Sequence, residues 1–223
     1  MIDVTNLTQP RKMTRSDLRQ VVELHAVCFP DYFLSGLGNR VLRDVYSYAL
    51  DDPQSAAAIL EVEATARIVG LAVGTFDPKF QPTVFRSYLV DFMWGFVRGL
   101  YTSDAVRKGA VRRLWDMKWA VKSLIDGLVR RKGLAKDISP KKNTYACLLV
   151  NAVHPEWRGW RNSERFLKHF TDWIFQMGAT GIWGTVYPEN LAALILYKRL
   201  RWNIKKTSDR GVIVWLNREE VRS

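Results

Sequence analysis

The residues between 144 and 202 have the types and spacing that could hold a phosphate group. An apolar run at 146–153 predicts a strand, a basic turn containing a glycine follows at 154–160, and residues 161–177 have the pattern of a helix. A helix N-terminus presents free backbone N–H groups and the positive end of the helix dipole to an anion. We therefore expect an anion site at the start of this helix.

Two side chains further along could add chemistry to that site. A second predicted strand, 181–186, leads to a predicted helix at 190–200. On the residues alone, Asn190 could bind a ligand or cap this helix, and Tyr197 could donate a proton or pack in an amphipathic core. Both interpretations of each residue stay open at this point.

Two motifs resemble those of the GNAT superfamily of acetyltransferases. Residues 153–163, with Phe166 and Leu167, resemble its acyl-CoA-binding motif, and residues 186–190, with Ala193 and Tyr197, are similar to its second signature. Two motifs in the expected order are a stronger signal than either one alone. The resemblance covers roughly residues 9–76 and 144–216. It implies a mixed α+β fold with a mostly antiparallel central sheet flanked by helices.

The resemblance also implies an acyl donor, acetyl-CoA, and a set of residues that hold it. The pyrophosphate would lie against the backbone of the turn and the first helical residues, which are Arg158, Gly159, Trp160, Arg161, Asn162 and Ser163. The pantetheine arm would meet unpaired backbone groups of Val150, Asn151, Ala152 and Val153, and the side chain of Asn190. Tyr197 would be the general acid for the leaving thiolate.

Two arginines depart from the family pattern. Arg161 stands where a glycine or small residue usually follows the Arg-Gly pair. Its long side chain either folds outward and adds a charged contact to phosphate or weakens cofactor binding. Arg201 stands where glycine commonly eases a left-handed turn after a helix, so we expect strain or a different turn there.

Transfer to an amine by direct attack needs a group that takes the proton of that amine. The candidates are Glu189, Tyr187, Asp31 and His25, and a core position on an apolar helix face is the competing interpretation for His25. The stretch 24–38 resembles a bacterial GNAT subgroup associated with surface-polysaccharide genes. That resemblance implies an amino sugar, free or linked to a nucleotide or a lipid, as the acceptor of the primary-amine acetylation.

The pattern before residue 77 predicts a strand, two helices and a hairpin. The strand is expected at 9–13, the helices at 18–28, with Ser16 as N-cap, and at 33–50, and the hairpin strands at 56–63 and 67–76. This order is also what the GNAT resemblance implies. We predict one domain over residues 1–223.

Residues 80–140 differ in character and are predicted to form a helical insertion within that domain. Apolar residues repeat at helical spacing over 84–100 and again over 104–132, where they are opposed by many cations. One interpretation is a helical layer with a solvated basic face. Another is a lid or interfacial element, because Phe92, Met93, Trp94, Phe96, Trp115 and Trp119 lie among cations. The segment could also wall in a small amine or bind an acidic carrier protein.

The charge and composition limit the partners. The formal net charge is +12 over 223 residues, which favours acidic partners such as an anionic membrane surface. No nucleic-acid motif occurs, so we expect no specific nucleic-acid binding. The two cysteines lie in apolar runs, the spacing of His and Cys predicts no metal site, and no signal-peptide or membrane-spanning pattern occurs.

These features predict a cytoplasmic acetyltransferase, with peripheral association at the inner membrane face as a further option. The alternative is a catalytically lapsed binding or membrane-associated module that uses its basic helices. The sequence predicts no particular oligomeric state.

Overall fold

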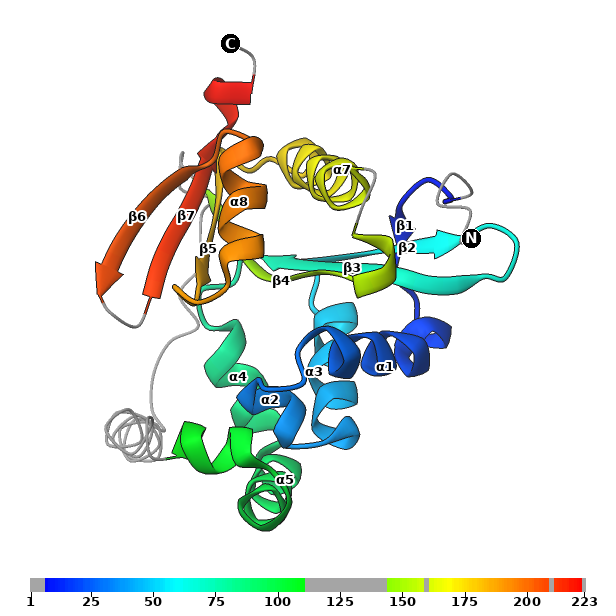
Figure 1. Ribbon diagram of the computed structural model, residues 1–223, viewed down its shortest axis with the longest axis vertical. Coiled ribbons are helices and arrows are strands. Elements are labelled where there is room, and N and C mark those ends of the chain that lie inside the picture. The colour runs from blue at the N-terminus through cyan, green and yellow to red at the C-terminus, as the bar shows by residue number, and fades with distance from the viewer. Residues whose placement is uncertain (1–6, 111–143, 159–160, 209–210, 222–223) are drawn as a thin grey trace.

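The computed structural model describes residues 7–110, 144–158, 161–208 and 211–221. A seven-stranded sheet in the order β1-β2-β3-β4-β5-β7-β6 runs through the molecule, and helices cover both of its faces (Figure 1). The strands are β1 (Arg11–Lys12), β2 (Ser55–Val62), β3 (Arg67–Thr75), β4 (Tyr145–Val153), β5 (Gly181–Val186), β6 (Asn203–Ser208) and β7 (Gly211–Asn217). All neighbouring strands pair antiparallel except β4 and β5, which are parallel. The predicted mixed α+β fold is therefore confirmed.

The two faces of the sheet have separate cores. On one face, α7 (Asn162–Gln176) and α8 (Leu191–Arg199) bury Phe166, Phe170 and Ile174. On the other face, α1 (Leu18–Cys28) and α3 (Asn39–Asp51) bury Val21, Leu42 and Tyr46. Because β3 lies between both cores, all of its residues after Arg67 are buried. A strand covered on both faces needs such a continuous apolar run.

Two predicted helices are each divided in the structure. The helix predicted at 33–50 consists of α2 (Phe33–Gly36) and α3, separated at Gly38, whose φ of 98° is left-handed. The helix predicted at 84–100 consists of α4 (Phe80–Ser87) and α5 (Leu89–Thr102), which meet at Tyr88. Tyr88 has φ −117° and ψ 31°, so the helical backbone is interrupted there.

The N-terminus of α1 is capped differently from the prediction. A short 3₁₀ turn, Arg15–Asp17, precedes α1, and Thr14 and Asp17 form a capping box in front of it. Ser16 therefore does not cap the helix. Arg11 donates to Asp17 from both terminal nitrogens, at 2.8 and 2.9 Å, which ties β1 to this turn.

Residues 80–110 pack on the main body through α4, α5 and residues 104–110. The prediction for 111–143, including most of the basic amphipathic stretch, lies outside the described residues. Whether 80–140 is an insertion stays a prediction. No helix within the described ranges is both long and apolar enough to cross a bilayer.

Candidate active site

The central feature of the site is that β4 and β5 part from each other. Their parallel pairing covers only Tyr145 to Cys147 on β4, although β4 continues to Val153. On its other side β4 stays paired with β3, where the register shifts between Leu148 and Val150. A bulge of this kind bends a strand and increases its twist. The edge of β4 that faces β5 is therefore open beyond Cys147.

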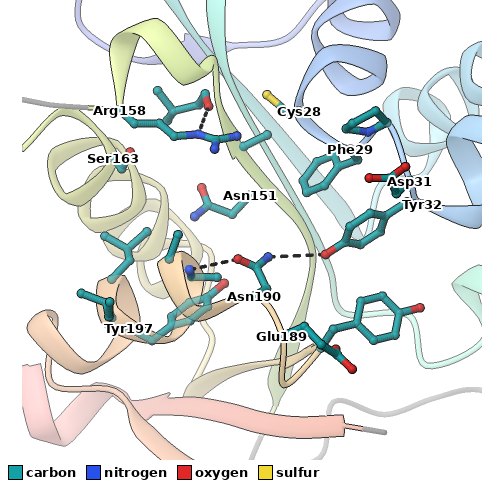
Figure 2. Close-up of a pocket in the computed structure, with 18 of the residues that line it drawn as sticks. Cys28, Phe29, Asp31, Tyr32, Asn151, Arg158, Ser163, Glu189, Asn190 and Tyr197 are labelled. Carbon is teal, nitrogen blue, oxygen red and sulfur yellow. Dashed lines mark hydrogen bonds between the residues drawn. The ribbon is translucent and has the colours of Figure 1, made fainter.

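A pocket of about 930 Å³ occupies this opening. Its walls come from the parted strand, from the N-terminal part of α7, from α8, and from the segment between α1 and α2 (Figure 2). Residues from both predicted motifs line it, namely Val153, Arg158, Arg161, Ser163, Glu189, Asn190 and Tyr197, together with Asn151 and Ala152 of β4. The fold thus joins two motifs that are about thirty residues apart in the sequence.

The start of α7 provides the anion-binding end of the pocket. Its N-cap residue, Arg161, adopts the left-handed conformation with φ 62° and gives the helix no side-chain cap. The first backbone N–H groups of a helix have no partner within it, so those of Ser163 and Glu164, which line the pocket, can bind an anion, whereas the predicted residue Asn162 is buried and does not line it. Glu164 pairs with Arg199 at 3.2 Å, which offsets its negative charge near that end.

One predicted backbone contact is already occupied. The Nε–H of Arg158 donates to the carbonyl oxygen of Val153 at 2.8 Å. This carbonyl, at the end of β4, therefore already has a hydrogen-bond partner. Val150 lies on the same strand but is not among the pocket-lining residues. The Asn162 side chain is buried and donates to the Trp157 carbonyl at 3.1 Å, which fixes the turn before α7. Gly159 and Trp160 lie outside the described residues.

Asn190 is both a helix cap and a pocket residue. Its Oδ1 accepts from the Ala193 backbone N–H at 3.1 Å, and its Nδ2–H donates to the Tyr32 hydroxyl at 3.4 Å (Figure 2). The capping interpretation is therefore confirmed, and the cap holds the side chain in place between α8 and Tyr32. One oxygen and one N–H group of Asn190 have well-defined partners before any ligand binds.

Tyr197 is buried on α8 and still lines the pocket. Its ring packs on Trp202 with ring centroids 4.8 Å apart. Burial raises the pKa of its phenol well above the ordinary value. The hydroxyl is therefore protonated at neutral pH and can act as a proton donor.

Arg201 adopts the strained turn that the sequence suggested. It has φ 59°, the Arg201 N–H donates to the Lys198 carbonyl at 3.1 Å, and the Trp202 N–H donates to the Tyr197 carbonyl at 2.9 Å. These two bonds and the packing of Trp202 on Tyr197 make a Schellman motif, whose left-handed position normally favours glycine. The turn keeps the hydrogen bonds of a Schellman motif, with Arg201 in the left-handed position.

The acidic and aromatic candidates lie at the other end of the pocket. Figure 2 shows Arg158 and Ser163 on one side, Asp31, Tyr32 and Glu189 on the other, and Asn151 and Asn190 between them. Tyr187 also lines the pocket and contacts Tyr32 edge-on, with ring centroids 5.3 Å apart. The structure therefore brings three of the four candidate proton acceptors into the site.

The fourth candidate, His25, does not line this pocket. It is buried in α1, its Nδ1 hydrogen-bonds the Tyr46 hydroxyl, and its Nε2 has no partner among the described residues. Burial lowers the pKa of His25 to about 4. His25 lies on the side of α1 that packs against α3. The core interpretation of His25 is therefore the one that the structure supports.

Sequence reasoning missed two features of the site. Tyr32 reaches Asn190 and Tyr187, although it is 158 residues before Asn190. Asn151 was expected to offer its backbone, but the residue lines the pocket and its buried side-chain Oδ1 has no partner among the described residues. A polar residue inside the apolar run 146–153 was the only signal that could have marked it.

The fold of the chain is similar to that of several N-acetyltransferases of known structure. The chain is similar to the ribosomal-protein alanine N-acetyltransferase of Escherichia coli, at 12% identity and TM-score 0.53, over 95% of this chain and 93% of that one. It is similar to a variant of the spermidine N-acetyltransferase SpeG of Vibrio cholerae, at 12% identity and TM-score 0.57, over 98% of both chains. It also resembles the PaiA N-acetyltransferase of Thermoplasma acidophilum in complex with coenzyme A, at 9% identity and TM-score 0.55, over 95% and 98%.

The chain therefore has the GNAT fold, as the two motifs predicted. No family model and no curated protein matches the sequence. No group of three or more His, Cys, Asp or Glu side chains that could hold a metal ion occurs in the described parts of the chain.

The strain at Arg201 predicts that a change to glycine has opposite effects on the free energy of unfolding at Arg201 and at Lys198. Arg201→Gly should raise the free energy of unfolding by about 1 kcal/mol, because glycine adopts the left-handed conformation without steric cost. The matched change Lys198→Gly, at an exposed helical position, should lower it by about 1 kcal/mol. Denaturant unfolding of both variants measures this. A loss of stability in both would show that Arg201 is not strained.

The burial of His25 leads to a prediction on pH. Its folded-state pKa lies near 4, below the unfolded value of about 6.5, so the unfolded chain binds the extra proton first. Stability should therefore fall by about 3 kcal/mol as the pH drops from about 6.5 towards 4. His25→Gln should flatten this part of the profile, whereas His169→Gln, at an exposed position, should leave it unchanged. Equal slopes in all three proteins would contradict the account of His25.

Proposed function

We propose that this protein is an acetyl-CoA-dependent N-acetyltransferase that acts on a small primary amine. The observation that carries the proposal is the pocket at the parted strands, where the uncapped start of α7 meets Asn190 and Tyr197 of α8. The fold alone does not decide activity, since one fold can serve several functions. The chemistry of the residues in this pocket does support transfer from a thioester.

The described residues fit acetyl-CoA, which supplies the acetyl thioester. The N-terminal amides of α7, with the arginines Arg158 and Arg161, would hold its phosphates by charge and by backbone donors. The open edge of β4 and the Asn151 side chain would hydrogen-bond its peptide-like arm. Arg161 stands where the family pattern has a glycine or small residue. It lines the pocket and is exposed, so its side chain can reach a phosphate.

The protonation states suit the two ends of the reaction. Tyr197 keeps its proton at neutral pH and can give it to the departing sulfur. At the acceptor end, Glu189 and Asp31 line the pocket and can take a proton from the attacking nitrogen, directly or through water. Burial raises the pKa of Tyr32, so this hydroxyl too stays neutral beside Asn190.

The acceptor end favours an amine, because carboxylates and aromatic rings attract an ammonium group. Asp31 and Glu189 line this pocket together with Phe29, Tyr32 and Tyr187, whereas Asp104, which also lines it beside Lys108, is paired with Arg107. Among amines we propose an amino sugar, on the resemblance of residues 24–38 to the polysaccharide-associated subgroup. Two of the proteins named above are a spermidine and a ribosomal-protein alanine N-acetyltransferase, so polyamines and peptide amines are the competing acceptors. The cytoplasmic location and an acidic carrier protein stay predictions.

The second candidate is a binding module that has lost catalysis. Arg161 and Arg201 both stand at positions that favour glycine, and both have left-handed φ values. This candidate requires that the strained turns abolish acetyl transfer from the thioester. Any acetyl transfer by the wild-type protein excludes it.

The acetyl-transfer assay of the wild-type protein separates these candidates, and replacement of Tyr197 tests its role as the proton donor. Tyr197→Phe should lower kcat by about 100-fold, because the proton donor is lost while the ring still packs on Trp202. The dissociation constant for coenzyme A should change little. The assay is thiol release from acetyl-CoA with a panel of amino sugars, amino acids and polyamines, with mass spectrometry of the acetylated product.

Tyr101→Phe is the matched control, because Tyr101 is exposed on α5 and does not line the pocket. It should have wild-type turnover. Wild-type turnover in Tyr197→Phe would remove Tyr197 from the mechanism. If no amine in the panel raises thiol release above the rate measured without protein, the result would favour the binding module.

A further inference from the structure

Helix α5 is apolar on two opposite faces. Its inner face places Phe92, Phe96 and Leu100 against α2 and α3. Gly95 and Gly99 allow this close approach, since a Cβ atom on Gly95 would lie 2.6 Å from the Leu37 carbonyl oxygen. This face fully accounts for the packing of α5 on the domain.

The outer face carries a second apolar stripe that points to solvent. It consists of Val90, Met93, Trp94, Val97 and Tyr101, whose exposed fractions are 80, 51, 67, 46 and 84%. At about 100° of rotation per residue, these five positions share one sector of about 100° of the helix surface. A surface helix of a globular protein normally places polar residues there. We call these five residues the α5 outer stripe.

We propose that the α5 outer stripe is a docking surface for an anionic lipid bilayer. Helices that lie in a membrane interface combine a narrow apolar stripe containing Trp with cations along its border. Trp and Tyr have polar atoms on large apolar rings and are enriched at the interface for that reason. Trp94 and Tyr101 supply such rings on this stripe.

The charges around the stripe select an anionic surface. Arg98 is exposed at the edge of the stripe, and Arg40, with a side chain 76% exposed, binds Asp91 of α5 at 2.8 Å. Arg86 is exposed at the end of the preceding helix, α4. The chain as a whole has a formal net charge of +12. Each cation near an anionic bilayer adds to the attraction.

A second copy of this chain fits the stripe less well. Two copies joined through α5 would bring the same positive charges together, at a Coulomb cost. A bilayer has the opposite charge and accepts a single narrow stripe, whereas a stable dimer needs a broad self-complementary patch. Helix α5 lies at one end of the longest axis of the molecule, away from α7 and β6 (Figure 1). Docking through α5 therefore leaves the half that contains α7 and β6 free.

The test is co-sedimentation of the full-length protein with vesicles of phosphatidylcholine alone or with one-third phosphatidylglycerol. The wild-type protein should bind the anionic vesicles, and more weakly at high salt. Met93→Ser/Trp94→Ser should lower the partition coefficient about tenfold or more, because it removes the apolar contact and keeps every cation. Thermal unfolding shows whether each variant is folded.

The matched control exchanges the same residue types elsewhere. Met177 and Trp183 are exposed to 40 and 37% in the other half of the molecule, and Met177→Ser/Trp183→Ser should bind as the wild type does. Equal binding of both double variants would overturn the proposal, since cations alone would then explain the attraction. No binding of wild-type protein to anionic vesicles would also overturn it. A dimer that only Met93→Ser/Trp94→Ser disrupts would then assign the stripe to a second copy.

Discussion

The parting of β4 from β5 is the constraint on which the rest of the site depends. A strand edge inside a folded domain leaves backbone N–H and C=O groups without partners, which is costly unless water or a ligand satisfies them. Here the edge opens beyond Cys147 and faces the pocket. The opening separates α7 from α8 and exposes the start of α7. The anion-binding end, the Asn190 cap and Tyr197 take their positions from this one departure from regular pairing.

Backbone strain is concentrated beside the same opening. Of the three non-glycine residues with left-handed φ among those described, Arg161 begins α7 and Arg201 ends the turn after α8. Such a conformation costs an L-residue roughly 1–2 kcal/mol, so packing around these turns must hold them. At Arg201 the holding contact is Trp202 on Tyr197, the proposed proton donor. Strain at functional sites is common where the surrounding structure determines the conformation.

Much of the fold could be predicted because its signals are local. Residues 18–28 and 181–186 had clear helical and apolar patterns, and the structure has α1 and β5 at those bounds. The breaks at Gly38 and Tyr88 were missed because the apolar period continues across them. The hairpin of β6 and β7 was not predicted as separate strands. Tyr32, Asn151 and the burial of His25 depend on contacts between distant segments, which no local pattern encodes.

The two arginines that depart from the family pattern decide between an active and a lapsed site, and both keep the local geometry that glycine would allow. We therefore expect the pocket at the parted strands to bind acetyl-CoA. Calorimetric titration of the wild-type protein with coenzyme A tests this claim most directly. We expect saturable binding with one site per chain, weakened by salt because the phosphates meet cations and helix-terminal amides. No binding at millimolar coenzyme A would contradict the account.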